Sequence, residues 1–235
     1  NLTRAVRIYS LAQSVSRASG PLLCGLLSVN FGYRAAFLAN ALTYIPSFIL
    51  LCTVKPKEPE KSDVKERPII NKPLFASVFV LSFCGISYNL VFGGVIERLS
   101  ISRQWLGWFM AAVGVGATLA ALVKKRTVYM GFGIPVCLAL LIFTKSAWWV
   151  VLVAVLYGGC DYLFFSFALA KINTDNKDSS LKRAMGIYTA LSTGALPLGY
   201  LVFGFVNQGF GIVPVLFLSA VLTGAAAVLF FGKIR

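Results

Sequence analysis

Residues 4–32 read RAVRIYSLAQSVSRASGPLLCGLLSVNFG, and residues 183–211 read RAMGIYTALSTGALPLGYLVFGFVNQGFG. Aligned without a gap at an offset of 179 residues, both copies begin with Arg-Ala-x-x-Ile-Tyr and end with Phe-Gly. Between Arg4 and Thr43, 10 of 40 positions are identical to their partners. An apolar composition raises the number of chance matches, but two matching blocks at one offset indicate an internal repeat.

The composition excludes a water-soluble globular domain. Of the 235 residues, 58% are apolar and 13% charged, whereas soluble domains carry about a quarter charged residues. The mean hydropathy of +0.80 also excludes a disordered chain. There is no histidine, and the five cysteines stand singly in apolar runs without a CxxC spacing. We therefore expect no metal site, cofactor or Ser-His-Asp triad, and no P-loop or nucleophile–base pair is visible, so an enzyme is not expected.

Eight segments are apolar and long enough to be read as membrane-spanning helices, which need about 20 such residues. The sequence therefore predicts an all-α integral membrane protein. The segments are residues 9–30, 34–53, 74–96, 105–123, 128–144, 147–170, 184–206 and 210–232.

The basic residues lie on one side of this arrangement. Counting lysine and arginine in alternate connections gives 17 on one side and 4 on the other, with Arg17 inside a helix. By the positive-inside rule both termini are cytoplasmic, in a multi-pass protein of the plasma (inner) membrane. This explains much of the net charge of +14 without nucleic acid as a partner.

The repeat predicts how the chain is divided. Both copies start in the cytoplasm, so they form a parallel repeat of the kind found in transporters built from two six-helix halves. Residues 54–72, with mixed charge and three prolines, read as a cytoplasmic linker. We expect residues 1–53 to be the last two helices of an N-terminal six-helix bundle and residues 73–235 to be the C-terminal six-helix bundle. Four further N-terminal helices are then expected before Asn1, and the alternative is a genuine eight-helix protein.

Several stretches resemble the major facilitator superfamily. Residues 16–25 (SRASGPLLCG), with Phe31-Gly32 and residues 37–42 (FLANAL), resemble its helices 5 and 6. Residues 182–188 (KRAMGIY), Pro197-Leu198-Gly199 and Gly204 resemble the helix 10–11 loop and helix 11, and residues 112–116 (AVGVG) resemble helix 8. The resemblance is nearest to the branch with the enterobactin exporter and macrolide efflux proteins. It implies a major facilitator-like bundle, of which helices 5–12 are present.

Two ionisable residues fall inside predicted spans, where charge is costly and by default functional. Arg17 lies in the inner half of the first span and Asp161 near the middle of the sixth. In the resembled fold these helices, numbers 5 and 10, approach each other. We expect Asp161 to line a central cavity and either to take up a proton or to pair with Arg17 as a gate. A static salt bridge is the structural alternative.

Polar and aromatic residues near these positions are candidates for a substrate cavity, because an apolar cavity with a few polar groups suits an amphipathic molecule. Ordinary interhelical contacts are the alternative for each of them. The candidates are Tyr88, Asn89, Tyr157, Tyr162, Asn40 and Tyr44.

Small and bend-forming residues are candidates for close helix packing and hinges. They are Gly20, Pro21, Gly25, Gly114, Gly116, Pro197, Gly199 and Gly204. The resulting hypothesis is a secondary active transporter that exports small amphipathic molecules, with protons as coupling ion and the lipid bilayer as surroundings. A membrane-embedded structural or assembly subunit that kept the fold without transport is the second hypothesis.

Overall fold

The computed structural model describes residues 2–53, 67–85, 88–123 and 128–233; many side chains before residue 34, and those of 85, 88, 89 and 178, are outside this description. Within the described ranges the chain forms eight α-helices, two 3-10 helices and no strand. They are α1 (Leu2–Thr53), α2 (Lys72–Gly85), α3 (Tyr88–Leu99), α4 (Trp105–Ala121), η1 (Val128–Phe132), α5 (Gly133–Ile142), α6 (Ala147–Asp175), α7 (Asp178–Phe210), α8 (Ile212–Phe230) and η2 (Phe231–Lys233).

A glycine turn has the same conformation in both copies of the repeat. α1 consists of two helical arms that meet at a kink at Gly32, where φ is 79° and ψ is 167°. Gly211, which lies 179 residues later between α7 and α8, has φ 78° and ψ −178°. This region of positive φ and extended ψ is open almost only to glycine. The Phe-Gly block of the sequence therefore marks the same hairpin turn in both pairs.

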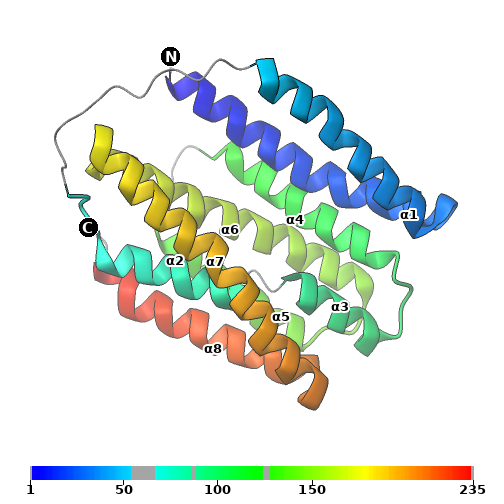
Figure 1. The fold of residues 1–235 in the computed structure, drawn as a ribbon. Coiled ribbons are helices and arrows are strands. Elements are labelled where there is room, and N and C mark those ends of the chain that lie inside the picture. Colours follow the sequence, from blue (N-terminus) through cyan, green and yellow to red (C-terminus); the bar gives the residue numbers. More distant parts are fainter. Residues whose placement is uncertain (1, 54–66, 86–87, 124–127, 234–235) are drawn as a thin grey trace.

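The helices pack in layers that place α4 near the centre (Figure 1). α4 packs on α6 along one side and on α1 along the other, so α4 lies between α1 and α6. α2 packs on α7 and α8, and α5 packs on α8 and α6. One face of the α7–α8 pair is therefore packed against other helices of the bundle.

One contiguous apolar core joins α2 through α8. Aromatic pairs connect distant parts of the chain: the rings of Phe164 and Phe231 are stacked with centroids 5.4 Å apart, and those of Phe92 and Phe109 are 5.5 Å apart. Such pairs add about 0.5–1.5 kcal/mol each beyond the apolar area that they bury. The core thus fixes α6 against the C-terminal end of α8.

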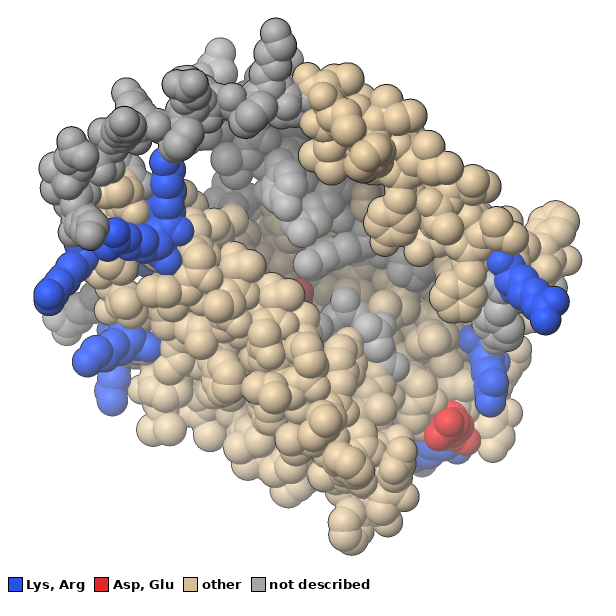
Figure 2. Space-filling view, viewed as in Figure 1, with Lys and Arg blue, Asp and Glu red and all other residues tan. Residues whose placement is uncertain are grey.

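The surface between the two ends of the bundle is apolar. Many large hydrophobic side chains are exposed there, among them Phe48, Leu119 and Phe217. Figure 2 shows lysine and arginine gathered at the two ends of the visible face, with almost none between. Exposed apolar area on this scale indicates contact with lipid rather than with water. The protein is therefore a multi-pass membrane protein.

The predicted spans correspond to helices, with differences in detail. By length and composition, four described helices could cross a membrane: Arg34–Thr53, Ala147–Asp175, Ser179–Phe210 and Ile212–Lys233. The third predicted span, 74–96, is made up of α2 and α3, on either side of residues 86–87, which lie outside the described ranges. The fifth span, 128–144, begins with a 3-10 helix before α5. Apolar composition predicts that a segment is buried but not where its helix stops.

Candidate functional site

Glycine backbones let α4 and α6 cross in direct contact. A Cβ atom added to Gly116 on α4 would overlap the carbonyl oxygen of Val155 on α6. A Cβ atom added to Gly158 on α6 would likewise overlap the carbonyl oxygen of Val113 on α4. Only glycine permits two helix backbones to approach so closely. The crossing holds the middle of α6, and with it Asp161, at a fixed place in the bundle.

Asp161 lies on the most buried face of α6. The residues that share this face at helical spacing, four and seven positions before it and three and seven positions after it, are almost inaccessible to solvent. They are Ala154 (0%), Tyr157 (2%), Phe164 (0%) and Ala168 (0%). Asp161 itself is partly exposed. Solvent access therefore reaches this face of α6 at the level of the carboxylate and is closed one turn above and below it.

The visible face of the molecule is hollowed between the α1 pair and the helices around α7. Figure 2 shows a small acidic surface at the floor of this hollow, and the described residues next to it are uncharged. A carboxylate in apolar surroundings is costly unless water or a partner reaches it. Such a hollow has the character of a site for an amphipathic ligand, with one polar group on an apolar wall.

The two tyrosines on α6, among the four predicted for the cavity, differ in position. Tyr157 is 2% exposed and belongs to the apolar core. Tyr162, which follows Asp161, is partly exposed. Both take part in polar or ring contacts. Tyr88 and Asn89 stand at the start of α3, with side chains outside the described set.

The helices that carry Arg17 and Asp161 do not pack closely on each other in the described part of the chain. α1 contacts α4, which separates it from α6 (Figure 1). The expectation that helices 5 and 10 approach each other is therefore corrected for the described part of the chain, where α4 lies between α1 and α6. Arg17 lies within α1, but its side chain is outside the described set, and so is the predicted pairing with Asp161.

A groove of about 580 Å³ lies between the two arms of α1. Its lining is mostly apolar: Gly20, Leu23, Cys24, Leu27, Ala36, Phe37, Ala39, Asn40 and Thr43. Asn40 thus lines this groove and not the hollow between the α1 pair and the helices around α7. Tyr44 follows the lining on the second arm and is 66% exposed.

The repeat indicates what a groove of this shape accommodates. Gly199 and Phe203 on α7 are the counterparts of Gly20 and Cys24. A Cβ atom on Gly199 would overlap the backbone of Phe83 on α2, and the rings of Phe203 and Phe83 are 5.6 Å apart. In the α7–α8 pair this face is therefore filled by a packed helix. The α1 groove has the form of a helix-packing face, and we do not place substrate in it.

The remaining candidate packing residues are placed as follows. Gly114 is buried in α4, and Pro197 is an exposed residue inside α7. A Cβ atom on Gly20 or Gly204 would meet no described atom within 4 Å outside its own helix. The surroundings of Pro21 and Gly25 are outside the described set.

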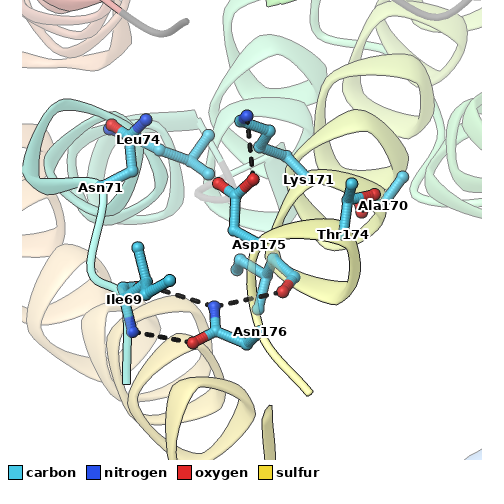
Figure 3. A network of polar contacts seen from close by, with 9 residues as sticks. Ile69, Asn71, Leu74, Ala170, Lys171, Thr174, Asp175 and Asn176 are labelled. Atoms are coloured by element: carbon cyan, nitrogen blue, oxygen red, sulfur yellow. Dashed lines mark hydrogen bonds and ion pairs between the residues drawn. The ribbon is translucent and has the colours of Figure 1, made fainter. Parts of the chain in front are cut away.

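A buried asparagine joins the end of residues 54–72 to the end of α6 (Figure 3). Asn176 is 2% exposed. Its Oδ1 accepts a hydrogen bond from the Ile69 N–H at 2.8 Å, and its Nδ2 donates to the Ile69 and Ile172 carbonyls, both at 3.2 Å. Close by, Lys171 and Asp175 form an ion pair at 2.9 Å. This clamp fixes the chain at Ile69 relative to the helix that carries Asp161.

Sequence reasoning missed Gly158 and Asn176. The pair Gly158-Gly159 inside an apolar run was a signal for close helix approach. No local pattern pointed to Asn176. Within the described residues no group of three or more histidine, cysteine, aspartate or glutamate side chains could hold a metal ion.

Comparison with protein families decides the class of the molecule. The family model described as Major Facilitator Superfamily matches residues 1–125, more than half of the chain. The chain belongs to the major facilitator superfamily. Comparisons with curated proteins and with solved structures gave no match. The protein is thus a membrane transporter of this superfamily, and the match covers α1 through α4, the helices on either side of residues 54–72.

Proposed function

We propose that this transporter exports small amphipathic organic molecules, of the drug or siderophore kind, in exchange for protons. In this proposal it belongs to the branch with the enterobactin exporter and macrolide efflux proteins, and it lies in the plasma membrane with both chain ends in the cytoplasm. Residues 1–53 end one bundle, residues 54–72 link the bundles and residues 73–235 form the second bundle. Substrate and proton use the hollow that reaches Asp161.

The burial pattern on α6 carries this proposal. Asp161 keeps partial solvent access while Tyr157 and Phe164, one turn away on either side, are 2% and 0% exposed. A carboxylate at membrane depth is retained against a cost of about 2.5–3.5 kcal/mol or more. Partial access lets such a group exchange a proton with water, and the apolar wall around it suits the apolar part of a substrate.

The contact between α1 and α4 supports alternating access. α1 belongs to the first pair of helices, whereas α4 is joined to α6 at the glycine crossing. We expect the two bundles to tilt against each other along α1 and α4. The Asn176 clamp keeps Ile69 with α6 during this motion.

A transport assay with matched acidic variants tests the proposal. The full chain is reconstituted into liposomes that contain a pH-sensitive dye, and proton flux is followed after addition of a panel of siderophores, macrolides and cationic dyes. Asp161→Asn is compared with Asp175→Asn, which removes a carboxylate from the same helix in the partly exposed pair with Lys171.

We expect at least one compound to drive proton movement with the parent chain and with Asp175→Asn, and none with Asp161→Asn. Unchanged flux with Asp161→Asn would contradict the role of Asp161. A folded parent chain that moves no protons with any compound would instead favour the membrane assembly role.

A further inference from the structure

Two cysteines from different helices face each other inside the bundle. Cys137 lies on α5 and is 3% exposed, and Cys160 lies on α6 and is partly buried. A side-chain hydrogen bond joins the thiols of Cys137 and Cys160. Each sulfur is therefore the neighbour of a second sulfur across the α5–α6 contact.

Gly133 creates the space for this pair. It precedes Cys137 by one helical turn and so lies on the same face of α5. A Cβ atom on Gly133 would overlap the Sγ atom of Cys160 and would lie 3.0 Å from its Cβ atom. The Cys160 side chain thus fills the notch that the missing side chain of Gly133 leaves, and the notch directs its sulfur along α5 toward Cys137.

We propose that Cys137 and Cys160 form a redox-sensitive dithiol, which a lipid-soluble two-electron oxidant of the quinone class converts to a disulfide between α5 and α6. Both cysteines lie in apolar segments, where an oxidant dissolved in the membrane reaches them more readily than a water-soluble one.

The oxidation follows ordinary thiol chemistry. One sulfur gives up its proton and attacks the quinone, and the second sulfur then attacks the first and displaces the reduced ring. The sulfur–sulfur bond forms as two S–H bonds are lost. Two electrons and two protons leave on the quinone, which becomes a hydroquinone.

The bond would tie α6 to α5 next to Asp161, the residue that follows Cys160 in the chain. Disulfide formation needs the two Cβ atoms to come within about 4.5 Å, and α5 and α6 approach each other closely at Gly133, one helical turn from Cys137.

The test uses the full chain in lipid nanodiscs, with Cys24, Cys52 and Cys84 replaced by serine so that only this pair remains. The probe is duroquinone, whose ring carbons are all substituted, so that a transient thiol adduct cannot convert to a stable thioether. We expect the intact mass to fall by two hydrogen atoms, reversibly on reduction, and a cross-linked peptide that contains residues 137 and 160. Cys137→Ser removes both signals. Persistence of two alkylatable thiols after oxidation, or a disulfide that joins two chains, would overturn the proposal.

Two glycine variants test the geometry behind it. Gly133→Ala places a methyl group where the Cys160 sulfur lies and is expected to lower the disulfide yield several-fold. Gly224→Ala on α8 is the matched control, because its new Cβ atom also faces α5 but would meet Pro135 there at 3.7 Å, an ordinary contact distance. Equal yields in the two variants would overturn the assignment of the notch. The circular dichroism spectrum verifies that both variants are folded.

Discussion

Adjacent glycines on α6 allow a sharp test of the α4–α6 crossing. A Cβ atom on Gly158 would lie 2.7 Å from the carbonyl carbon and 2.8 Å from the Cα atom of Val113, with the carbonyl oxygen closer still. A Cβ atom on Gly159 would meet its nearest atom, the Gly116 carbonyl oxygen, at 3.5 Å, which is an ordinary contact. The same substitution to alanine is therefore a clash at one position and harmless at the next.

The expected magnitude follows from the overlap. To bring the new methyl group to ordinary contact, α4 and α6 must separate by at least about 0.7 Å, and a gap of that size loses roughly a quarter to a half of each van der Waals attraction. Overpacking of this kind costs about 1–3 kcal/mol. Alanine is a better helix former than glycine by about 1 kcal/mol at both positions, so this gain cancels in the comparison.

Thermal unfolding of the purified variants measures the difference, followed by the emission of the four tryptophans. Gly158→Ala is expected to unfold about 4–8 °C below Gly159→Ala, the shift that ~2 kcal/mol produces in a chain of this size. If Gly158→Ala is as stable as Gly159→Ala, the two backbones do not touch at this crossing, and the reasoning that fixes α6 by its glycines is wrong.

Two further predictions concern the clamp and the hairpin turn. Asn176→Ala removes the acceptor of the Ile69 N–H, so amide hydrogen exchange at Ile69 should accelerate roughly tenfold, the effect of one hydrogen bond of about 1.4 kcal/mol. Asn173→Ala is the control and should leave this exchange unchanged, because the Asn173 side chain donates to the Leu169 carbonyl of its own helix. Equal exchange rates at Ile69 in both variants would contradict the clamp. Gly211→Ala forces alanine to φ 78° at a cost of about 1–3 kcal/mol and should lower the unfolding temperature by several degrees. Gly209→Ala is the control and should not lower it, because Gly209 has open space around it and no positive φ. A Gly211→Ala variant as stable as the parent chain would mean that the turn is not held in this conformation.

Much of the fold could be predicted because its signals are local. Apolar runs gave the helices, and the repeated Phe-Gly block marked the turns at Gly32 and Gly211, whose backbone angles agree closely. The exceptions have a physical reason. An apolar run does not show where a regular α-helix begins, so the predicted span 128–144 gave no sign of the 3-10 helix that precedes α5.

The site was less accessible to sequence reasoning because it depends on which helices are neighbours. Asp161 stood out as a charge in an apolar run, but its burial pattern requires the packed bundle. The close approach of α4 and α6 depends on glycine contacts between residues more than 40 positions apart, such as Gly158 and Val113. The Asn176 clamp spans a still larger distance in sequence, from residue 176 to residue 69.

Proton release upon substrate binding tests the central role of Asp161 most directly. The purified full chain is mixed with a compound that drives proton flux, in weakly buffered solution with a pH indicator. The parent chain and Asp175→Asn should each release protons as the compound binds, and Asp161→Asn should bind the compound and release none. Equal proton release from Asp161→Asn would contradict the proposal that substrate and proton compete at this carboxylate.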